Sequence, residues 1–141
     1  MDGEALSLVE RAVARHGGER WSRIEALELP VLALSGFLPW LKGYPRSFGL
    51  PRLVRIEPVR GRAVFVDYPR PGEHGVFDRG RVALGEAEPV EHRASFAGAG
   101  RRRRWSALDA LYFFGYALTH YHALPWSLRD AEALDVQRTG R

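Results

Sequence analysis

The chain has 141 residues, of which 45% are hydrophobic, and these values are typical of one globular domain with its own apolar core. It contains no cysteine, which excludes disulfides, thiolate-bound zinc, iron–sulfur clusters and a cysteine nucleophile. We therefore expect residues 1–141 to form a single domain.

The formal net charge is +4, and the run Arg101-Arg102-Arg103-Arg104 alone contributes that many positive charges. Lys42 is the only lysine of the chain. A protein that binds nucleic acid usually spreads lysine and arginine over a whole face. The composition therefore argues against a nucleic-acid partner.

The N-terminal sequence Met1-Asp2-Gly3-Glu4 is acidic and lacks the basic start of a secretory signal. The longest apolar stretch, Leu29 to Leu41, is interrupted by prolines and is shorter than the roughly 20 residues of a membrane helix. These features predict a cytoplasmic location, with at most peripheral contact with an anionic membrane.

The segment Glu4 to His16 places Leu6, Val9 and Val13 at helical spacing, which predicts an amphipathic helix. Gly17-Gly18 is expected to end it, because glycine readily adopts the left-handed conformation that closes a last turn. Beyond it, Trp21 and Ile24 are expected to pack back onto the helix.

Between Ile24 and Arg93, short runs of β-forming residues alternate with glycine and proline, which predicts an antiparallel meander. Tyr68 to Gly72 contains two prolines and predicts a loop, and Asp78-Arg79-Gly80 predicts a tight hairpin turn. The expected strands are Leu29–Leu34, Phe37–Lys42, Arg52–Glu57, Arg62–Tyr68, His74–Phe77, Arg81–Leu84 and Pro89–Arg93. In the tail, Leu134 and Val136 alternate in a way that allows one more strand.

A second helix is predicted from Ser106, a candidate N-cap with Asp109 three residues later, to about Ala123. Both of its sides are apolar, which is typical of a helix enclosed in a core, and Gly115 would allow close approach to another backbone. Pro125 is expected to end it.

One set of residues along the second helix is a candidate for binding or catalysis. Tyr112, Tyr116, Thr119 and His122 could line a cavity along the second helix, although aromatic residues at helical spacing more often belong to a core. His120 and His122 diverge by about 200° on a helix, which argues against a shared metal ion. The sequence contains no nucleophile elbow, phosphate-binding loop or dinucleotide fingerprint, so we expect neither a cofactor nor catalytic residues.

Arg101, Arg102, Arg103 and Arg104, followed by Trp105, could bind phosphates or anionic lipid head groups, because guanidinium groups make bidentate contacts with such anions. A solvated loop is the simpler interpretation of such a run. The run directly precedes the second helix, and positive charge at the N-terminal end of a helix is unfavourable with respect to the helix dipole. Local stability therefore does not explain the run.

Several short motifs follow one another along the chain: His16-Gly17-Gly18 with Trp21, the Gly36–Gly43 stretch, Tyr68-Pro69-Arg70-Pro71-Gly72 with Gly75-Val76-Phe77, and Trp105 before Tyr112-Phe113-Phe114-Gly115-Tyr116-Ala117-Leu118, Tyr121 and Pro125. In this order they resemble uncharacterised bacterial proteins related to the LolA/LolB/LppX lipoprotein-carrier fold. The resemblance extends from about Leu8 to Trp126, and none of its motifs is catalytic.

The resemblance implies an α+β fold with a curved antiparallel sheet, an unclosed barrel, whose concave side encloses an apolar cavity covered by helices. Such carriers are exported and continue into further strands, so this chain would be an incomplete half-barrel. The residues expected to contact a ligand there are Val54, Ile56, Phe65, Tyr112, Tyr116, Thr119 and His122.

The leading hypothesis is a non-enzymatic binding or carrier protein for a hydrophobic or amphipathic, lipid-like molecule. Alternatives are an enzyme or cyclase-like protein that acts on an apolar metabolite, with Tyr112, Tyr116, His120 or His122 as acid–base groups, and a truncated structural relative without a ligand. An incomplete sheet also leaves an unpaired edge, for which a second copy in a homodimer is the simplest cover, ahead of the chain's own tail.

Overall fold

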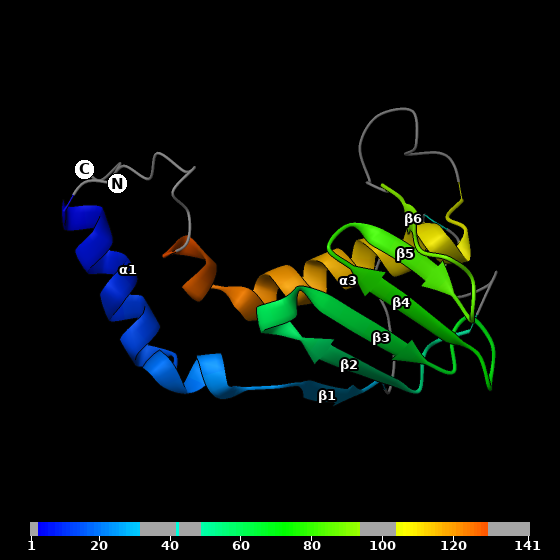
Figure 1. Ribbon diagram of the computed structural model, residues 1–141, viewed down its shortest axis with the longest axis horizontal. Coiled ribbons are helices and arrows are strands. Elements are labelled where there is room, and N and C mark those ends of the chain that lie inside the picture. The colour runs from blue at the N-terminus through cyan, green and yellow to red at the C-terminus, as the bar shows by residue number, and fades with distance from the viewer. Residues whose placement is uncertain (1–2, 32–41, 43–48, 94–103, 130–141) are drawn as a thin grey trace.

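The computed structural model describes residues 3–31, 42, 49–93 and 104–129, and shows an α+β fold (Figure 1). Six strands lie in the sheet in chain order, and all neighbours are antiparallel, so the sheet is an open meander that is not closed into a barrel. The elements are α1 (Gly3–Arg15), η1 (Gly18–Arg23), β1 (Leu27–Pro30), β2 (Leu53–Glu57), η2 (Pro58–Arg60), β3 (Arg62–Val66), β4 (His74–Asp78), β5 (Arg81–Leu84), β6 (Val90–Glu91), α3 (Ala107–Ala123) and η4 (Trp126–Leu128).

The N-terminal helix is confirmed, but the side that it buries differs from the prediction. Ala5, Val9 and Val13 are buried, whereas Leu6 is exposed. Residues four apart fall on one side of a helix, and this spacing continues from Val13 through Val9 to Ala5 rather than to Leu6. In Figure 1, α1 stands at one end of the molecule, beyond the end of the sheet.

Most predicted strands are present, some with shifted bounds. The first begins at Leu27, two residues before the predicted start at Leu29. Of the predicted Pro89–Arg93 strand, only Val90 and Glu91 pair with β5. The predicted strand Phe37–Lys42, apart from Lys42, and the tail with Leu134 and Val136 lie outside the described residues.

The sheet has two different faces, and α3 lies across one of them (Figure 1). Cross-strand pairing places the apolar side chains of this face in register, which is the usual basis of sheet stability. Leu111 of α3 is fully buried against them. The residues of this face include Leu27, Leu29, Val54, Ile56, Ala63, Phe65, Gly75, Phe77, Val82 and Leu84.

The opposite face carries a row of alternating charge across five strands. Each acidic residue of the row stands opposite an arginine of the neighbouring strand, an arrangement that favours the observed register because like charges would repel. The row consists of Glu57, Arg62, Asp78, Arg81 and Glu91.

The end of β3 departs from the predicted alternation. The predicted strand places Phe65 and Tyr68 on opposite faces, but both belong to the buried cluster, with ring centroids 5.7 Å apart. The strand ends at Val66, and Asp67 has a positive φ of 59°, which reverses the side-chain direction. The Tyr68 hydroxyl then donates to the carbonyl of Ala107 at 2.6 Å and connects the loop to the start of α3.

The start of α3 and its contact with the sheet agree with the sequence. Ser106 and Asp109 form a complete capping box. Gly115 packs directly onto β4, because a Cβ at this position would lie 2.4 Å from the Cβ of Phe77. Trp105 precedes this helix in the chain. The ammonium group of the fully buried Lys42 lies 5.9 Å from the ring centroid of Trp105.

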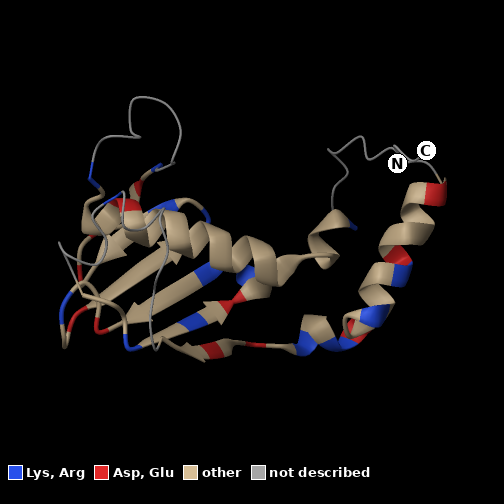
Figure 2. Cartoon of the chain, turned by 180° about the vertical axis from the view of Figure 1, so that it is seen from behind, with Lys and Arg blue, Asp and Glu red and all other residues tan. Residues whose placement is uncertain are grey.

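Charge is distributed very differently over the two helices (Figure 2). Arginine and glutamate recur along α1, whereas Asp109 is the only Asp, Glu, Lys or Arg in α3. Within the described part of the chain, neither helix combines the length and apolar character required to cross a bilayer.

Candidate functional site

Three recesses lie around η2, the turn between β2 and β3. We call the largest of these three, with a volume of about 400 Å³, the α3 groove. Its volume is in the range of small-molecule sites. It is lined by Pro58, Gly61, Phe77, Arg79, Gly80, Glu91, His92, Arg93, Tyr112, Tyr116, Thr119, His120 and Ala123.

One wall of the α3 groove is a row of parallel rings along α3. Tyr112 and Tyr116 have ring centroids 6.2 Å apart and planes inclined by 11°. Tyr116 and His120 are 5.6 Å apart with planes inclined by 6°. The row results from spacing, because residues four apart lie one above another on a helix. Tyr116 is 50% exposed, so this aromatic wall is accessible.

A histidine–aspartate pair adjoins Tyr112. His92 Nε2 donates to Asp109 Oδ1 at 2.9 Å, and the His92 ring centroid lies 6.0 Å from that of Tyr112. Burial by itself would raise the pKa of Asp109. Hydrogen bonds from the backbone and hydroxyl of Ser106 and from His92, together with the charge of His92, outweigh this effect and hold that pKa below its ordinary value. The carboxylate that orients His92 is therefore anionic at neutral pH.

Charged side chains border the groove at its hairpin end. Arg79 and Arg93 supply two positive charges and Glu91 one negative charge, so this lining has an excess positive charge when both histidines are neutral. An aromatic wall beside a basic border suits a ligand with an apolar body and a polar or anionic group.

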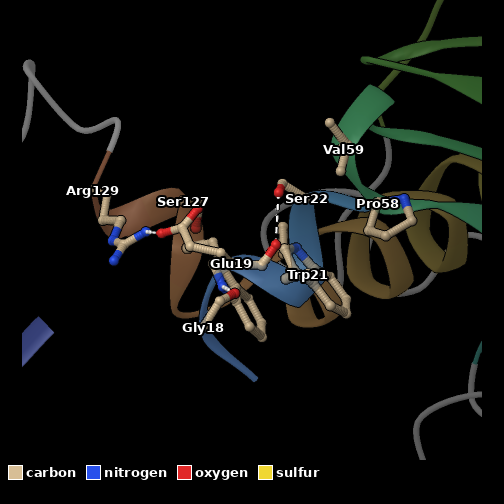
Figure 3. A pocket seen from close by; sticks show the side chains of 10 residues that line it. Gly18, Glu19, Trp21, Ser22, Pro58, Val59, Ser127 and Arg129 are labelled. Carbon is tan, nitrogen blue, oxygen red and sulfur yellow. Dashed lines mark hydrogen bonds and ion pairs between the residues drawn. The ribbon is translucent and has the colours of Figure 1, made fainter. Parts of the chain in front are cut away.

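The second recess, of about 340 Å³, lies between η1, η2, the end of α3 and η4 (Figure 3). We call it the clasp recess, because residues of both ends of the described chain meet there. The indoles of Trp21 and Trp126 stack with centroids 4.2 Å apart, and Trp126 Nε1 donates to the carbonyl of Gly18 at 3.1 Å. Trp21 was expected to pack on the first helix, and the structure shows its ring stacked on Trp126, the residue that follows Pro125.

Arg129 adds an ionic connection to this clasp. Its guanidinium donates to Glu10 of α1 and, at 3.0 Å, to Glu19 of η1. These hydrogen bonds raise the pKa of Arg129 above its ordinary value, so the group stays charged. The aromatic stack and this network hold α1 to the C-terminal end of α3.

The third recess, of about 360 Å³, surrounds the buried carboxylate of Glu57. Arg62 and Arg60 donate to Glu57 at 3.1 and 3.4 Å, and Arg55 lies 3.8 Å from it. Most buried carboxylates require such pairing. Each arginine is therefore engaged in neutralising a buried charge.

The structure brings together three of the predicted ligand-contacting residues, and places the other four elsewhere. Tyr112, Tyr116 and Thr119 line the α3 groove, with the Thr119 hydroxyl donating to the carbonyl of Gly115 at 2.8 Å. His122 does not line this groove, and its Nδ1 lies 2.7 Å from the carbonyl oxygen of Leu118. Three others lie in the core between sheet and helix: Val54, Ile56 and Phe65.

Of the predicted anion-binding run, Arg104 is described and exposed, and Arg101, Arg102 and Arg103 lie outside the described residues. His120 and His122 have different partners, as their angular separation predicts. In the described ranges, three or more His, Cys, Asp or Glu side chains do not gather into a set that could hold a metal ion.

Sequence reasoning missed His92 and Arg79 as groove residues. His92 follows a two-residue strand and meets Asp109, 17 positions later, only through the fold. A signal for Arg79 was present, because a two-residue hairpin turn of the favoured type requires positive φ at both positions. Arg79 has φ 47° and Gly80 φ 94°, so both positions of this turn adopt it.

Searches with family models, curated proteins and solved structures found no match to this chain.

Proposed function

We propose that this protein binds or carries a hydrophobic or amphipathic small molecule without catalysing a reaction, and that the α3 groove is its binding site. The observation that carries the proposal is the accessible row of parallel rings formed by Tyr112, Tyr116 and His120. Aromatic walls with a few polar groups at one end are typical of small-molecule sites. The nearly uncharged α3 supports a ligand with an apolar body.

We further propose that the sheet is the incomplete barrel of the carrier fold, with α3 on its concave side. The side chains of α3 pack against Val54, Ile56 and Phe65, which are 2%, 0% and 3% exposed. A ligand would reach these three residues only if α3 moved away from the sheet. The α3 groove needs no such movement, which favours it as the first binding site.

The proposal is tested with phenylnaphthylamine, a neutral aromatic probe whose fluorescence rises when it leaves water. We expect saturable binding by the wild type. Tyr116→Ala is expected to weaken binding about tenfold, because it removes the exposed middle ring of the row. Circular dichroism of each variant checks that the fold is unchanged.

Tyr121→Ala is the matched control. Tyr121 is on the same helix and is 69% exposed, but it does not line the α3 groove. We expect its removal to leave probe affinity within twofold of the wild type. Equal weakening by both variants, or an unaffected Tyr116→Ala, would contradict a binding site in this groove.

The enzyme alternative now rests on His92 rather than on the tyrosines. A carboxylate that orients an imidazole at 2.9 Å is the usual support of a general base. A carrier releases its ligand unchanged, whereas an enzyme converts it. Mass spectrometry of co-purified ligand, before and after incubation with wild type and His92→Gln, separates the two: conversion that only the wild type performs would favour the enzyme.

A further inference from the structure

We infer that the α3 groove selects ligands that carry an anionic group, and that Arg79 is the residue that binds this group. The inference rests on the proposed function, because it names the ligand class of the same groove. It is carried by the backbone of the β4–β5 turn, where an arginine occupies a conformation that arginine disfavours.

The turn between β4 and β5 has two residues, Arg79 and Gly80, between the paired residues Asp78 and Arg81. Their φ values of 47° and 94° identify a turn with positive φ at both central positions. Asparagine, aspartate and glycine dominate the first of these positions, because glycine has no Cβ to clash with the backbone and the short polar side chains of the other two can hydrogen-bond locally. Arg79 therefore costs stability where a common residue would not.

The position of Arg79 offers a reason for this cost. Its backbone N–H donates to the carbonyl of Gly61 at 3.1 Å. The contact is so close that a Cβ at Gly61 would lie 3.2 Å from Arg79 Cγ. The stem of Arg79 is thus held against the β2–β3 turn, at the border of the α3 groove. Strained residues of this kind concentrate at binding sites.

The charges around Arg79 are compatible with an anionic ligand. Asp78 Oδ1 accepts from Arg79 Nε at 3.3 Å, and the two side chains are 45% and 79% exposed, so this ion pair is weak. A bidentate contact with a carboxylate, sulfonate or phosphate can use the terminal Nη atoms, which this ion pair does not involve. Arg93 also lines this end of the groove and adds positive charge and hydrogen-bond donors, beside the carboxylate of Glu91.

The ligand class that follows is an amphiphile with an aromatic or aliphatic body and one anionic group. The body would lie along Tyr112 and Tyr116, and the anion at Arg79. A free inorganic anion would lack the contacts with the aromatic wall and is expected to bind much more weakly.

The test compares two probes that share an aromatic body: neutral phenylnaphthylamine and anionic anilinonaphthalene sulfonate. The variant is Arg79→Asn, which removes the charge and places a favoured residue in the turn. We expect about tenfold weaker binding of the sulfonate, the loss that corresponds to one charge-assisted hydrogen bond, and affinity for the neutral probe within twofold. We also expect a higher melting temperature, because the strain is relieved.

Arg70→Asn is the matched control, since Arg70 is 80% exposed at its side chain, against 79% for Arg79, and lies in another loop. It should change neither probe affinity. Displacement of the sulfonate by decanoate, but not by inorganic phosphate at the same concentration, would show that the anion must be attached to an apolar body.

Three results overturn the assignment of Arg79 as the anion-binding residue: unchanged sulfonate binding by Arg79→Asn, equal weakening of both probes, or a lower melting temperature. Failure of the proposed function gives a different pattern. If the wild type binds the sulfonate through Arg79 but not the neutral probe, the apolar site is refuted and the anion site stands. If phosphate displaces the sulfonate as well as decanoate does, the ligand class is wrong.

Discussion

Replacing Gly115 by alanine is expected to destabilise this protein, although alanine is the better helix former. In an unconstrained helix the substitution would stabilise by about 1 kcal/mol. Here the new Cβ would lie 2.4 Å from the Cβ and 2.5 Å from the Cγ of Phe77. Phe77 is buried, and its Cβ is fixed to the backbone of β4, so a rotamer change cannot remove the overlap. Either α3 or the strand has to move.

The magnitude follows from the cost of overpacking. Extra atoms in a well-packed core cost about 1–3 kcal/mol, and contact with a fixed Cβ belongs at the upper end of that range. Subtracting the gain in helix propensity of about 1 kcal/mol leaves a net loss of about 2 kcal/mol. Urea unfolding followed by circular dichroism measures it as a midpoint lower by roughly 1 M.

Gly3→Ala is the control for this prediction. Gly3 also lies in a helix, but a Cβ there would have no atom within 4 Å, so we expect a neutral or slightly stabilising effect. If Gly115→Ala raised the urea midpoint as well, the close contact between α3 and β4 would be refuted.

Two further predictions concern the clasp and acid stability. Trp126→Ala removes the stack on Trp21 and the hydrogen bond to Gly18 and should lower the local stability of α1 by about 2 kcal/mol, less than for a fully buried indole. Hydrogen exchange should show lost protection in α1 with the sheet unchanged, and Trp126→Phe should show a smaller effect; equal loss across the sheet would contradict a local clasp. The pKa of Asp109 is lower in the folded state than its ordinary value of 3.8, so its stabilising contribution is complete above that pH and is lost as the pH falls through the folded pKa. The free energy of unfolding, measured from pH 7 towards pH 2, should decrease less steeply for Asp109→Asn than for the wild type, and parallel profiles would show that the cap carries no such contribution.

Local signals in the sequence determined most elements of this fold. The N-terminal helix, the Gly17-Gly18 stop and the Ser106–Asp109 capping box each depend on neighbouring residues, and the structure confirms all three, although α1 buries Ala5 in place of Leu6. The hairpin at Gly80 and the order of the strands are also local, because a meander pairs each strand with the next along the chain. Such features can be predicted without knowing the rest of the molecule.

Tertiary structure decided where the candidate site lies. Alternation along β3 places Ala63 and Phe65 on one face of the strand, but the positive φ of Asp67 brought Tyr68 to the same side as Phe65, and no local pattern announces that reversal. Periodicity identified Tyr112 and Tyr116 as neighbours on one helix, but it could not show that Phe65 lies beneath α3 and not in an open cavity. Sequence separation hides such contacts, because His92 meets Asp109 and Trp126 meets Gly18 only after the sheet and both helices have packed. The groove is therefore a property of the packed elements, whereas the rings that line it are already visible in the sequence.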